Sequence, residues 1–238
     1  MARDRPLAIL VALEVEAQAL IRRLAPSTTS SPQLSVWEGV VKGTPVVLVI
    51  TGVGKVAAAL AAQFTLDRFD PASLLVVGLA GATDGDGQRG ELIVASGAMQ
   101  HDMDARPFSD ARGVIPSLGK TMFAADPTLS EKLRNASESV VSNPGIVRSG
   151  VVLTGDQIVT SRVIRDGLLA NFPNGACLDM ETAAIAQVAH QNGIPWAALR
   201  ITSDASDETF NLKDILGFGV DTAADLFDQI VRAFLKAS

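Results

Sequence analysis

The chain has 238 residues, and 20 Lys and Arg against 26 Asp and Glu give it a net charge of −6. An acidic chain without a run of basic residues disfavours nucleic acid as a partner, because that binding depends on cations that replace the counterions of phosphates. A single cysteine, Cys177, excludes an intrachain disulfide and is typical of a reducing compartment, so we expect a cytoplasmic protein.

The first fifty residues predict a buried strand and a hairpin. Residues 7–13 form a continuous apolar run, as expected for a strand that is buried on both faces, and Glu14 and Glu16 follow near its end. Two apolar segments, 34–41 and 46–51, are separated by a Gly-Thr-Pro turn. We expect these two segments to pair as an antiparallel hairpin.

A glycine turn, Gly52-Val53-Gly54, joins this hairpin to a helix expected over 55–69. A strand, a glycine turn and a helix in this order are the context of a dinucleotide-binding motif. The next strand, expected over 74–79, ends in Gly78-Leu-Ala-Gly81, however, and lacks the acid that binds ribose in such motifs. The triphosphate-binding pattern also fails, since Val49 stands at its first glycine. We therefore expect no cofactor, and interpret both glycine turns as places where backbone approaches a ligand closely.

The segment after residue 90 combines a strand with a cluster of polar residues. An apolar strand at 91–98 follows the strand at 74–79, and the pair predicts a second hairpin. His101-Asp102-Met103-Asp104 comes next, and a His with two acids suggests a metal ligand set. The three are almost adjacent and no further ligand pair accompanies them, so we expect no metal.

The rest of the chain continues to alternate helices and strands. Helical spacing appears at 127–140 and 220–235, with an apolar strand at 146–153. The uncharged segment 182–199 contains polar residues, Gly and Pro, which indicate a helix, a turn and a strand, so we expect no membrane contact. No linker or repeat interrupts this pattern. We expect a single three-layer α/β/α domain over residues 1–238, with a mixed, mostly parallel central sheet.

The stretch 177–204 brings charged residues to strand ends. Glu181 opens a helix after a short strand, while Arg200 lies within an apolar strand that Asp204 ends. Each residue has an ordinary explanation: Glu181 as a favourable charge at a helix start, Asp204 as a cap and Cys177 as a small buried hydrophobe. An arginine is costly to bury without a partner, however, and the carboxyl ends of strands form the ligand crevice of open α/β sheets. The combination favours a pocket.

Several motifs of this chain occur together in one known family. Met180-Glu181 opens an Ala-rich helix, and an Arg-x-x-Ser-Asp pattern follows at Arg200, Ser203 and Asp204. Five further segments keep the order of that family: 12–17, 52–58, 78–81, 100–104 and 154–156. The chain thus resembles the purine nucleoside phosphorylase superfamily over nearly its whole length. Within it, the chain most resembles the 5'-methylthioadenosine/S-adenosylhomocysteine nucleosidases.

The resemblance implies hydrolysis of the N-glycosidic bond of a 5'-modified adenine nucleoside, with release of adenine. By motif match, Asp204 would donate a proton to the purine, and we hypothesise that Ser203 orients its carboxyl. Glu16 would accept a proton from the attacking water. Glu181 would hold the ribose hydroxyls, while Met180 packs against the ring. Carboxylates near the anomeric carbon suit this chemistry because the sugar passes through an oxocarbenium-like state.

The acids after the first strand favour water over phosphate as the acceptor. Phosphorylases of this superfamily place a Gly-rich, Arg-bearing loop there, because phosphate needs cations and N–H donors. This chain carries Glu14 and Glu16 instead, and the choice of Glu16 as the base rests on the family register alone. Three alternatives stay open: a phosphate-dependent phosphorylase, a nucleoside-binding protein without catalysis, and a hydrolase of another 5'-modified purine nucleoside.

Two departures from the family pattern concern substrate binding. Leu79 stands where the nucleosidases commonly have Ser, and Ile158 where an aromatic residue commonly stacks on adenine. Ile158 and Val159 can still bind a purine through backbone groups and apolar contact. The residues expected beside the 5' substituent are apolar: Leu13, Val53 and Leu212.

The segment after His101-Asp102-Met103-Asp104 predicts a dimer through the resemblance. In that family it lies at the dimer interface and lends residues to the pocket of the neighbouring subunit. By position, Ala105 and Phe108 would be the lent residues here, so we expect a homodimer. Arg106 lies between them and has no counterpart that we can assign.

Overall fold

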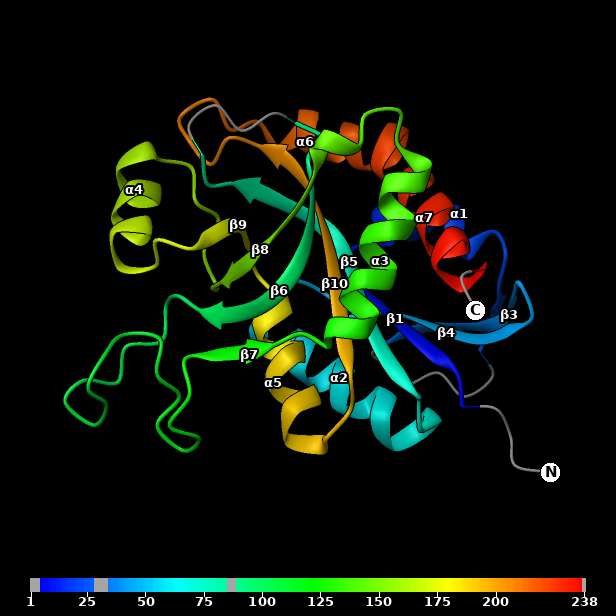
Figure 1. Cartoon of the computed structure of the whole chain (residues 1–238), viewed down its shortest axis with the longest axis horizontal. Coiled ribbons are helices and arrows are strands. Elements are labelled where there is room, and N and C mark those ends of the chain that lie inside the picture. The colour runs from blue at the N-terminus through cyan, green and yellow to red at the C-terminus, as the bar shows by residue number, and fades with distance from the viewer. Residues whose placement is uncertain (1–4, 28–33, 85–88, 237–238) are drawn as a thin grey trace.

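The computed structural model describes residues 5–27, 34–84 and 89–236. Its strands are β1 (Leu7–Val11), β2 (Ala25–Pro26), β3 (Ser35–Val41), β4 (Thr44–Ile50), β5 (Ser73–Ala82), β6 (Leu92–Gln100), β7 (Met122–Ala124), β8 (Val147–Thr154), β9 (Gly175–Asp179) and β10 (Trp196–Asp204). Its helices are α1 (Glu14–Ile21), α2 (Lys55–Phe69), α3 (Pro127–Val140), α4 (Arg162–Asn171), α5 (Thr182–Asn192), α6 (Leu212–Phe218) and α7 (Ala224–Lys236), with a 3₁₀ turn η1 (Pro144–Ile146) and a π-helical segment η2 (Gly219–Ala223). Figure 1 shows the strands at the centre with helices around them.

Strand β1 is the buried strand that the apolar run predicted. It lies between β4 and β5 and runs parallel to both. Its side chains alternate between two apolar clusters, with Leu7, Ile9 and Val11 in one and Ala8 and Leu10 in the other. Because successive side chains of a strand point to opposite faces, this alternation shows that both faces of the sheet are covered.

The hairpin expected over 34–51 is confirmed. Strands β3 and β4 pair antiparallel along their whole length, from Ser35 opposite Ile50 to Val41 opposite Thr44. Lys42 and Gly43 form the turn with φ values of 53° and 85°. Positive φ at both central residues matches the twist of the two strands, which explains the glycine at this position.

The second expected hairpin, over 74–98, is wrong, because β10 lies between β5 and β6. Strand β10 pairs parallel with β5 and antiparallel with β6. Strand β10 is buried along most of its length, so its backbone groups need partners on both sides, and these two strands supply them.

A closed ring of strands replaces part of the expected open sheet. Pairings run from β5 to β10, β6, β8 and β9, and β9 returns to β5 with Gly81 opposite Leu178. The expectation of a mostly parallel sheet is also wrong. Parallel pairings join β1–β4, β1–β5, β5–β10, β6–β8 and β8–β9, whereas β2–β3, β3–β4, β5–β9, β6–β7 and β6–β10 are antiparallel. Closing the ring and adding hairpins therefore makes the sheet evenly mixed.

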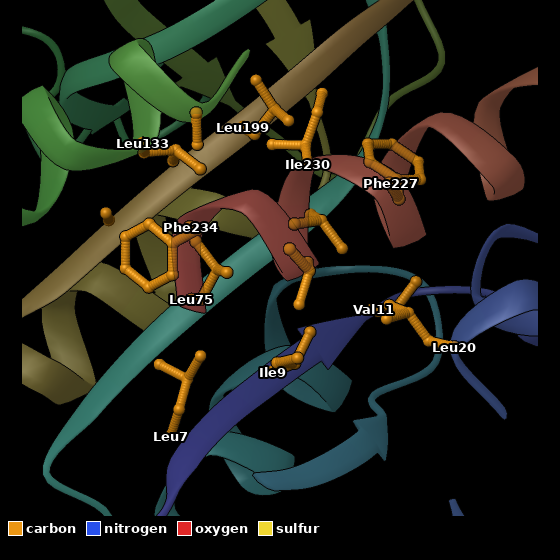
Figure 2. Packing of buried hydrophobic residues seen from close by; sticks show 14 of the residues in the cluster. Leu7, Ile9, Val11, Leu20, Leu75, Leu133, Leu199, Phe227, Ile230 and Phe234 are labelled. Atoms are coloured by element: carbon orange, nitrogen blue, oxygen red, sulfur yellow. The ribbon is translucent and has the colours of Figure 1, made fainter. Parts of the chain in front are cut away.

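Helices α1, α3 and α7 cover one face of the sheet. Figure 2 shows this cluster, in which Phe227, Ile230 and Phe234 of α7 pack among side chains of the strands and of α1 and α3. The sequence predicted one amphipathic helix over 220–235, and the structure begins α7 at Ala224 after the π-helical segment. The apolar positions recur at helical spacing on the face that the sheet buries.

Helices α2 and α5 cover the opposite face. Their small side chains, including Ala58, Ala62 and Ala186, are fully buried against the strands. Small residues allow the helices to approach the sheet closely, so the helices on the two faces give the expected layers around the strands. In the parts of the chain that the structure describes, no helix combines the length and the apolar character that a membrane span requires.

Candidate active site

A pocket of about 230 Å³ opens at the carboxyl ends of the strands. Almost all of the predicted site residues line it: Leu13, Glu16, Val53, Leu79, Ile158, Val159, Met180, Glu181, Arg200, Ser203 and Asp204. Leu212, expected beside the 5' substituent, lines it as well. The exception is Phe108, whose side chain is 90% exposed and lies outside this pocket. Its predicted role concerned the pocket of a neighbouring subunit.

Glu16 faces the pocket from the first turn of α1. Its carboxylate accepts hydrogen bonds from the backbone N–H of Leu13, at 3.0 Å, and of Leu79, at 2.7 Å. Burial raises the pKa of Glu16 above its usual value, although the Leu79 N–H and the Arg200 charge oppose this shift. Glu14 is exposed and lies outside the pocket. The fold therefore places Glu16, and not Glu14, on the wall of the pocket.

Arg200 is fully buried and is held from three sides. Its Nη2 lies 2.5 Å from Asp179 Oδ2 and 3.6 Å from Glu181 Oε2. Its Nη1 donates to the carbonyl of Leu79 at 3.3 Å. The guanidinium also donates to Thr182 Oγ1 through Nε and Nη2, at 3.0 and 2.8 Å. A buried arginine needs such partners, as the apolar strand around it indicated.

Asp179 is a site residue to which the sequence analysis assigned no role. Besides the Arg200 ion pair, its carboxylate accepts hydrogen bonds from Thr154 Oγ1 and from both Oγ1 and N–H of Thr182. Arg200 could have pointed to Asp179, because a buried arginine requires an acid nearby. The stretch 177–204 contains three acids near strand ends, however, and the sequence alone does not say which of them reaches the guanidinium.

Glu181 connects this buried network to the pocket. Its Oε1 accepts a hydrogen bond from the Gly54 N–H at 2.9 Å, while Oε2 faces Arg200. Burial raises the pKa of Glu181 to about 7, and the charge of Arg200 opposes the shift. The Gly54 N–H just before α2 and the charge of Arg200 in β10 thus orient a carboxylate that would otherwise be costly to bury.

Asp204 occupies the end of β10 and is separate from the arginine network. Ser203 Oγ donates to its Oδ2 at 2.7 Å, in agreement with the expectation that Ser203 orients this carboxyl. The Ser206 N–H donates to Oδ1 at 2.9 Å. No ion pair joins Asp204 to Arg200 within the described residues. Of the three charged residues predicted for the pocket, Arg200 and Glu181 therefore form an ion pair, while Asp204 lies apart from them.

The glycines of the strand ends make room for these side chains. A Cβ at Gly78 would collide with Nη1 of Arg200, and one at Gly81 would collide with the Ser206 hydroxyl. The sequence predicted that the backbone of this turn approaches a ligand closely. At Gly78 the nearby space is filled by the Arg200 side chain, whereas Gly81 lies against the Ser206 hydroxyl and also lines the pocket.

The substitution Gly78→Ala is expected to displace the Arg200 guanidinium and to lower the free energy of unfolding by about 1–3 kcal/mol. Urea unfolding measures this change. Gly167→Ala in α4 is the matched control, because nothing lies within 4 Å of its added Cβ. The control is expected to be neutral or stabilising. Equal unfolding midpoints for the two variants would contradict the assigned packing of Arg200.

Two sequence expectations concerned Cys177 and the segment His101-Asp102-Met103-Asp104. Cys177 is fully buried, and burial raises the pKa of its thiol far above the usual value, so it is the small buried hydrophobe that was expected. His101 is 2% exposed and burial lowers its pKa. In the described parts of the chain, no three His, Cys, Asp or Glu side chains are grouped as metal ligands.

Comparisons with known proteins identify the family of this chain. The family described as the phosphorylase superfamily matches residues 6–236. This chain belongs to the phosphorylase superfamily. The resemblance that the sequence motifs indicated is confirmed, including its nucleosidase branch.

Several members of the superfamily that resemble this chain are nucleosidases. A 5'-methylthioadenosine/S-adenosylhomocysteine nucleosidase of Anoxybacillus flavithermus is 31% identical over 209 residues, which cover 87% of this chain and 88% of the relative. The crystal structure of the corresponding Neisseria meningitidis nucleosidase, in complex with methylthio-immucillin-A, has a TM-score of 0.90 at 28% identity and covers 98% and 100% of the two chains. The Colwellia psychrerythraea nucleosidase, in complex with adenine, has a TM-score of 0.88 at 29% identity, with 98% and 96% covered.

Proposed function

We propose that this superfamily member hydrolyses the N-glycosidic bond of a 5'-modified adenine nucleoside and releases adenine. Its relatives are named as nucleosidases, and solved neighbours hold adenine or methylthio-immucillin-A. The observation that carries the proposal is Glu16, a buried carboxylate on the pocket wall after β1. An acid at this place repels phosphate and suits a water molecule, which favours hydrolysis over phosphorolysis.

The three pocket acids divide the reaction between them. Asp204 donates a proton to the purine as the C–N bond breaks, so that adenine leaves neutral. Glu16 removes a proton from water as its oxygen bonds to the anomeric carbon. Glu181 accepts hydrogen bonds from the ribose hydroxyls, and the negative charge of these acids stabilises the oxocarbenium-like sugar.

Apolar side chains complete the proposed substrate site. Leu13, Val53 and Leu212 line the pocket where the 5' substituent would lie, which favours an uncharged group there. Ile158 is 54% exposed at the pocket wall and offers apolar contact without aromatic stacking. At Leu79, where the resemblance leads one to expect Ser, the backbone N–H donates to Glu16 and the backbone carbonyl accepts from Arg200.

The proposal is tested with purified protein, 5'-methylthioadenosine and a measurement of free adenine, with and without phosphate. We expect adenine release that is independent of phosphate, together with a free reducing sugar. Release that requires phosphate and yields a sugar phosphate would identify a phosphorylase. Binding without release would identify a nucleoside-binding protein. Release from a different 5'-modified purine nucleoside, but not from this one, would identify another nucleosidase.

We further propose a homodimer in which the segment around Ala105 and Phe108 lies at the interface. Phe108 supports this because 90% of a large apolar side chain is exposed in the isolated chain. Arg106, which had no assignment, pairs with Asp104 at 2.5 Å within the same segment. Sedimentation is expected to show a dimer at micromolar concentration, and Phe108→Ser is expected to weaken it. A fully active monomer would contradict the proposal.

We also propose that the chain forms one cytoplasmic domain. The two main apolar clusters share strands β1, β5, β6 and β10, which supports a single folding unit. The single cysteine, Cys177, is free and buried, which supports a reducing compartment.

A further inference from the structure

A closed ring of hydrogen bonds lies just outside the pocket. The Lys55 ammonium donates to Asp102 Oδ1 at 2.6 Å, and the Asp156 N–H donates to Asp102 Oδ2 at 2.9 Å. The ring closes where the Lys55 N–H donates to Asp156 Oδ1 at 2.7 Å. Its members come from the start of α2, the loop after β6 and the loop after β8. None of the three lines the pocket.

This ring holds the first turn of α2 by both the side chain and the backbone of Lys55. The preceding residue, Gly54, has a φ of 96°, which only glycine adopts without strain, and its N–H donates to Glu181. A Cβ on Gly54 would lie 3.1 Å from Asp156 Oδ1, so the glycine also fits closely against the ring. The amide that binds Glu181 is therefore next in the chain to the amide that Asp156 binds.

The ion pair in the ring is better shielded than the surface pairs of this chain. The side chains of Lys55 and Asp102 are 17% and 28% exposed. Burial raises the pKa of Asp102, but the Lys55 and Asp156 hydrogen bonds outweigh it, so that the pKa lies below its usual value. A second acceptor, Gln100 Oε1, lies 3.2 Å from the Lys55 ammonium and limits its movement.

We propose that Lys55, Asp102 and Asp156 are positioning residues that set the orientation of the Glu181 carboxylate through Gly54. The inference rests on the proposed role of Glu181 in holding the ribose hydroxyls. Without the ring, the start of α2 is free to move, and Glu181 loses one of its two polar partners. The carboxylate then turns toward Arg200, and the hydrogen bond to the ribose is weakened while the purine and 5' contacts remain.

The test measures ribose recognition by binding, so that it does not depend on turnover. The probes are the 7-deaza analogue of 5'-methylthioadenosine and its 3'-deoxy form, which lack the purine nitrogen that Asp204 would protonate. Calorimetry is expected to show that the wild-type chain binds the hydroxylated probe about 10- to 100-fold more tightly, as for a hydrogen bond to a charged group. In Lys55→Met and Asp102→Asn this preference is expected to fall to within about threefold.

Two controls separate positioning from a general loss of structure. Arg5→Met breaks the Arg5–Asp70 ion pair at the other end of α2, 2.7 Å long, and is expected to leave the preference unchanged. Lys55→Arg keeps a cation opposite Asp102 and is expected to restore most of the preference. If Lys55→Met weakens both probes equally, the ring has a structural role alone and the proposal is wrong.

The same experiment separates this inference from the proposed function. If the wild-type protein discriminates the probes but releases no adenine from 5'-methylthioadenosine, the proposed function is wrong. The Lys55 and Asp102 variants then still decide whether the ring orients Glu181. Wild-type protein that binds neither probe would overturn both. In a Glu181→Ala background, Lys55→Met is expected to change binding of the hydroxylated probe by less than about twofold, because its effect passes through Glu181. Additive losses there would also overturn the proposal.

Discussion

Replacing Glu16 by Gln is expected to lower the turnover of 5'-methylthioadenosine at least about a hundredfold, the lower range for an acid–base group. The amide cannot accept a proton from water. It also cannot accept both backbone hydrogen bonds from Leu13 and Leu79, since one of its two ends is itself a donor. Binding of the nucleoside is expected to suffer less than turnover, because the lost step occurs after binding.

The pH dependence gives this prediction a second readout. Glu16 must be ionised to act as a base, and burial raises its pKa. The rate is therefore expected to fall as the pH is lowered through that raised pKa, at a higher pH than for an exposed glutamate. The exposed Glu14 provides the matched control, and Glu14→Gln is expected to keep both the rate and the acid limb. Near-native turnover of Glu16→Gln would show that another group activates the water.

Replacing Asp204 by Asn is expected to lower turnover by a similar factor, at least about a hundredfold. The Asn side chain keeps the shape of Asp and one acceptor for Ser203 or Ser206, so the end of β10 is expected to stay folded. It cannot transfer a proton to the leaving purine, which then departs as an anion. Single-turnover measurements of adenine release are expected to locate the loss in bond cleavage.

The neighbouring acid Asp207 is the control for Asp204. Its Oδ1 accepts hydrogen bonds from the N–H and hydroxyl of Thr209, which an Asn oxygen can retain, and it lies outside the pocket. Asp207→Asn is expected to keep near-native turnover. Equal losses in the two variants would indicate that the loop conformation, and not proton transfer by Asp204, limits the reaction.

Local patterns in the sequence predicted much of what surrounds the pocket. The apolar run at 7–13, the β3–β4 hairpin and the helix after Gly54 were all expected, because strand and helix periods and turn residues act within a few positions of each other. The acids near the predicted strand ends also indicated where the pocket lies, because the end of a strand can be recognised from the local sequence. The sequence pattern alone did not decide which of Glu14 and Glu16 faces the pocket. Both belong to the same helical turn, and only the packing of the tertiary structure buries one of them.

The partners of the buried charges were decided by the tertiary structure. The sequence by itself determined that Arg200 needs an acid, since its strand is apolar and burial of an unpaired charge is costly. The tertiary structure decided three further points. Arg200 pairs with Asp179, β10 lies between β5 and β6 in the closed ring of strands, and Lys55 reaches Asp102. These contacts join segments far apart in the chain, and no local periodicity encodes such pairings. They arise because each buried backbone and charged group finds a partner only when the whole sheet has closed.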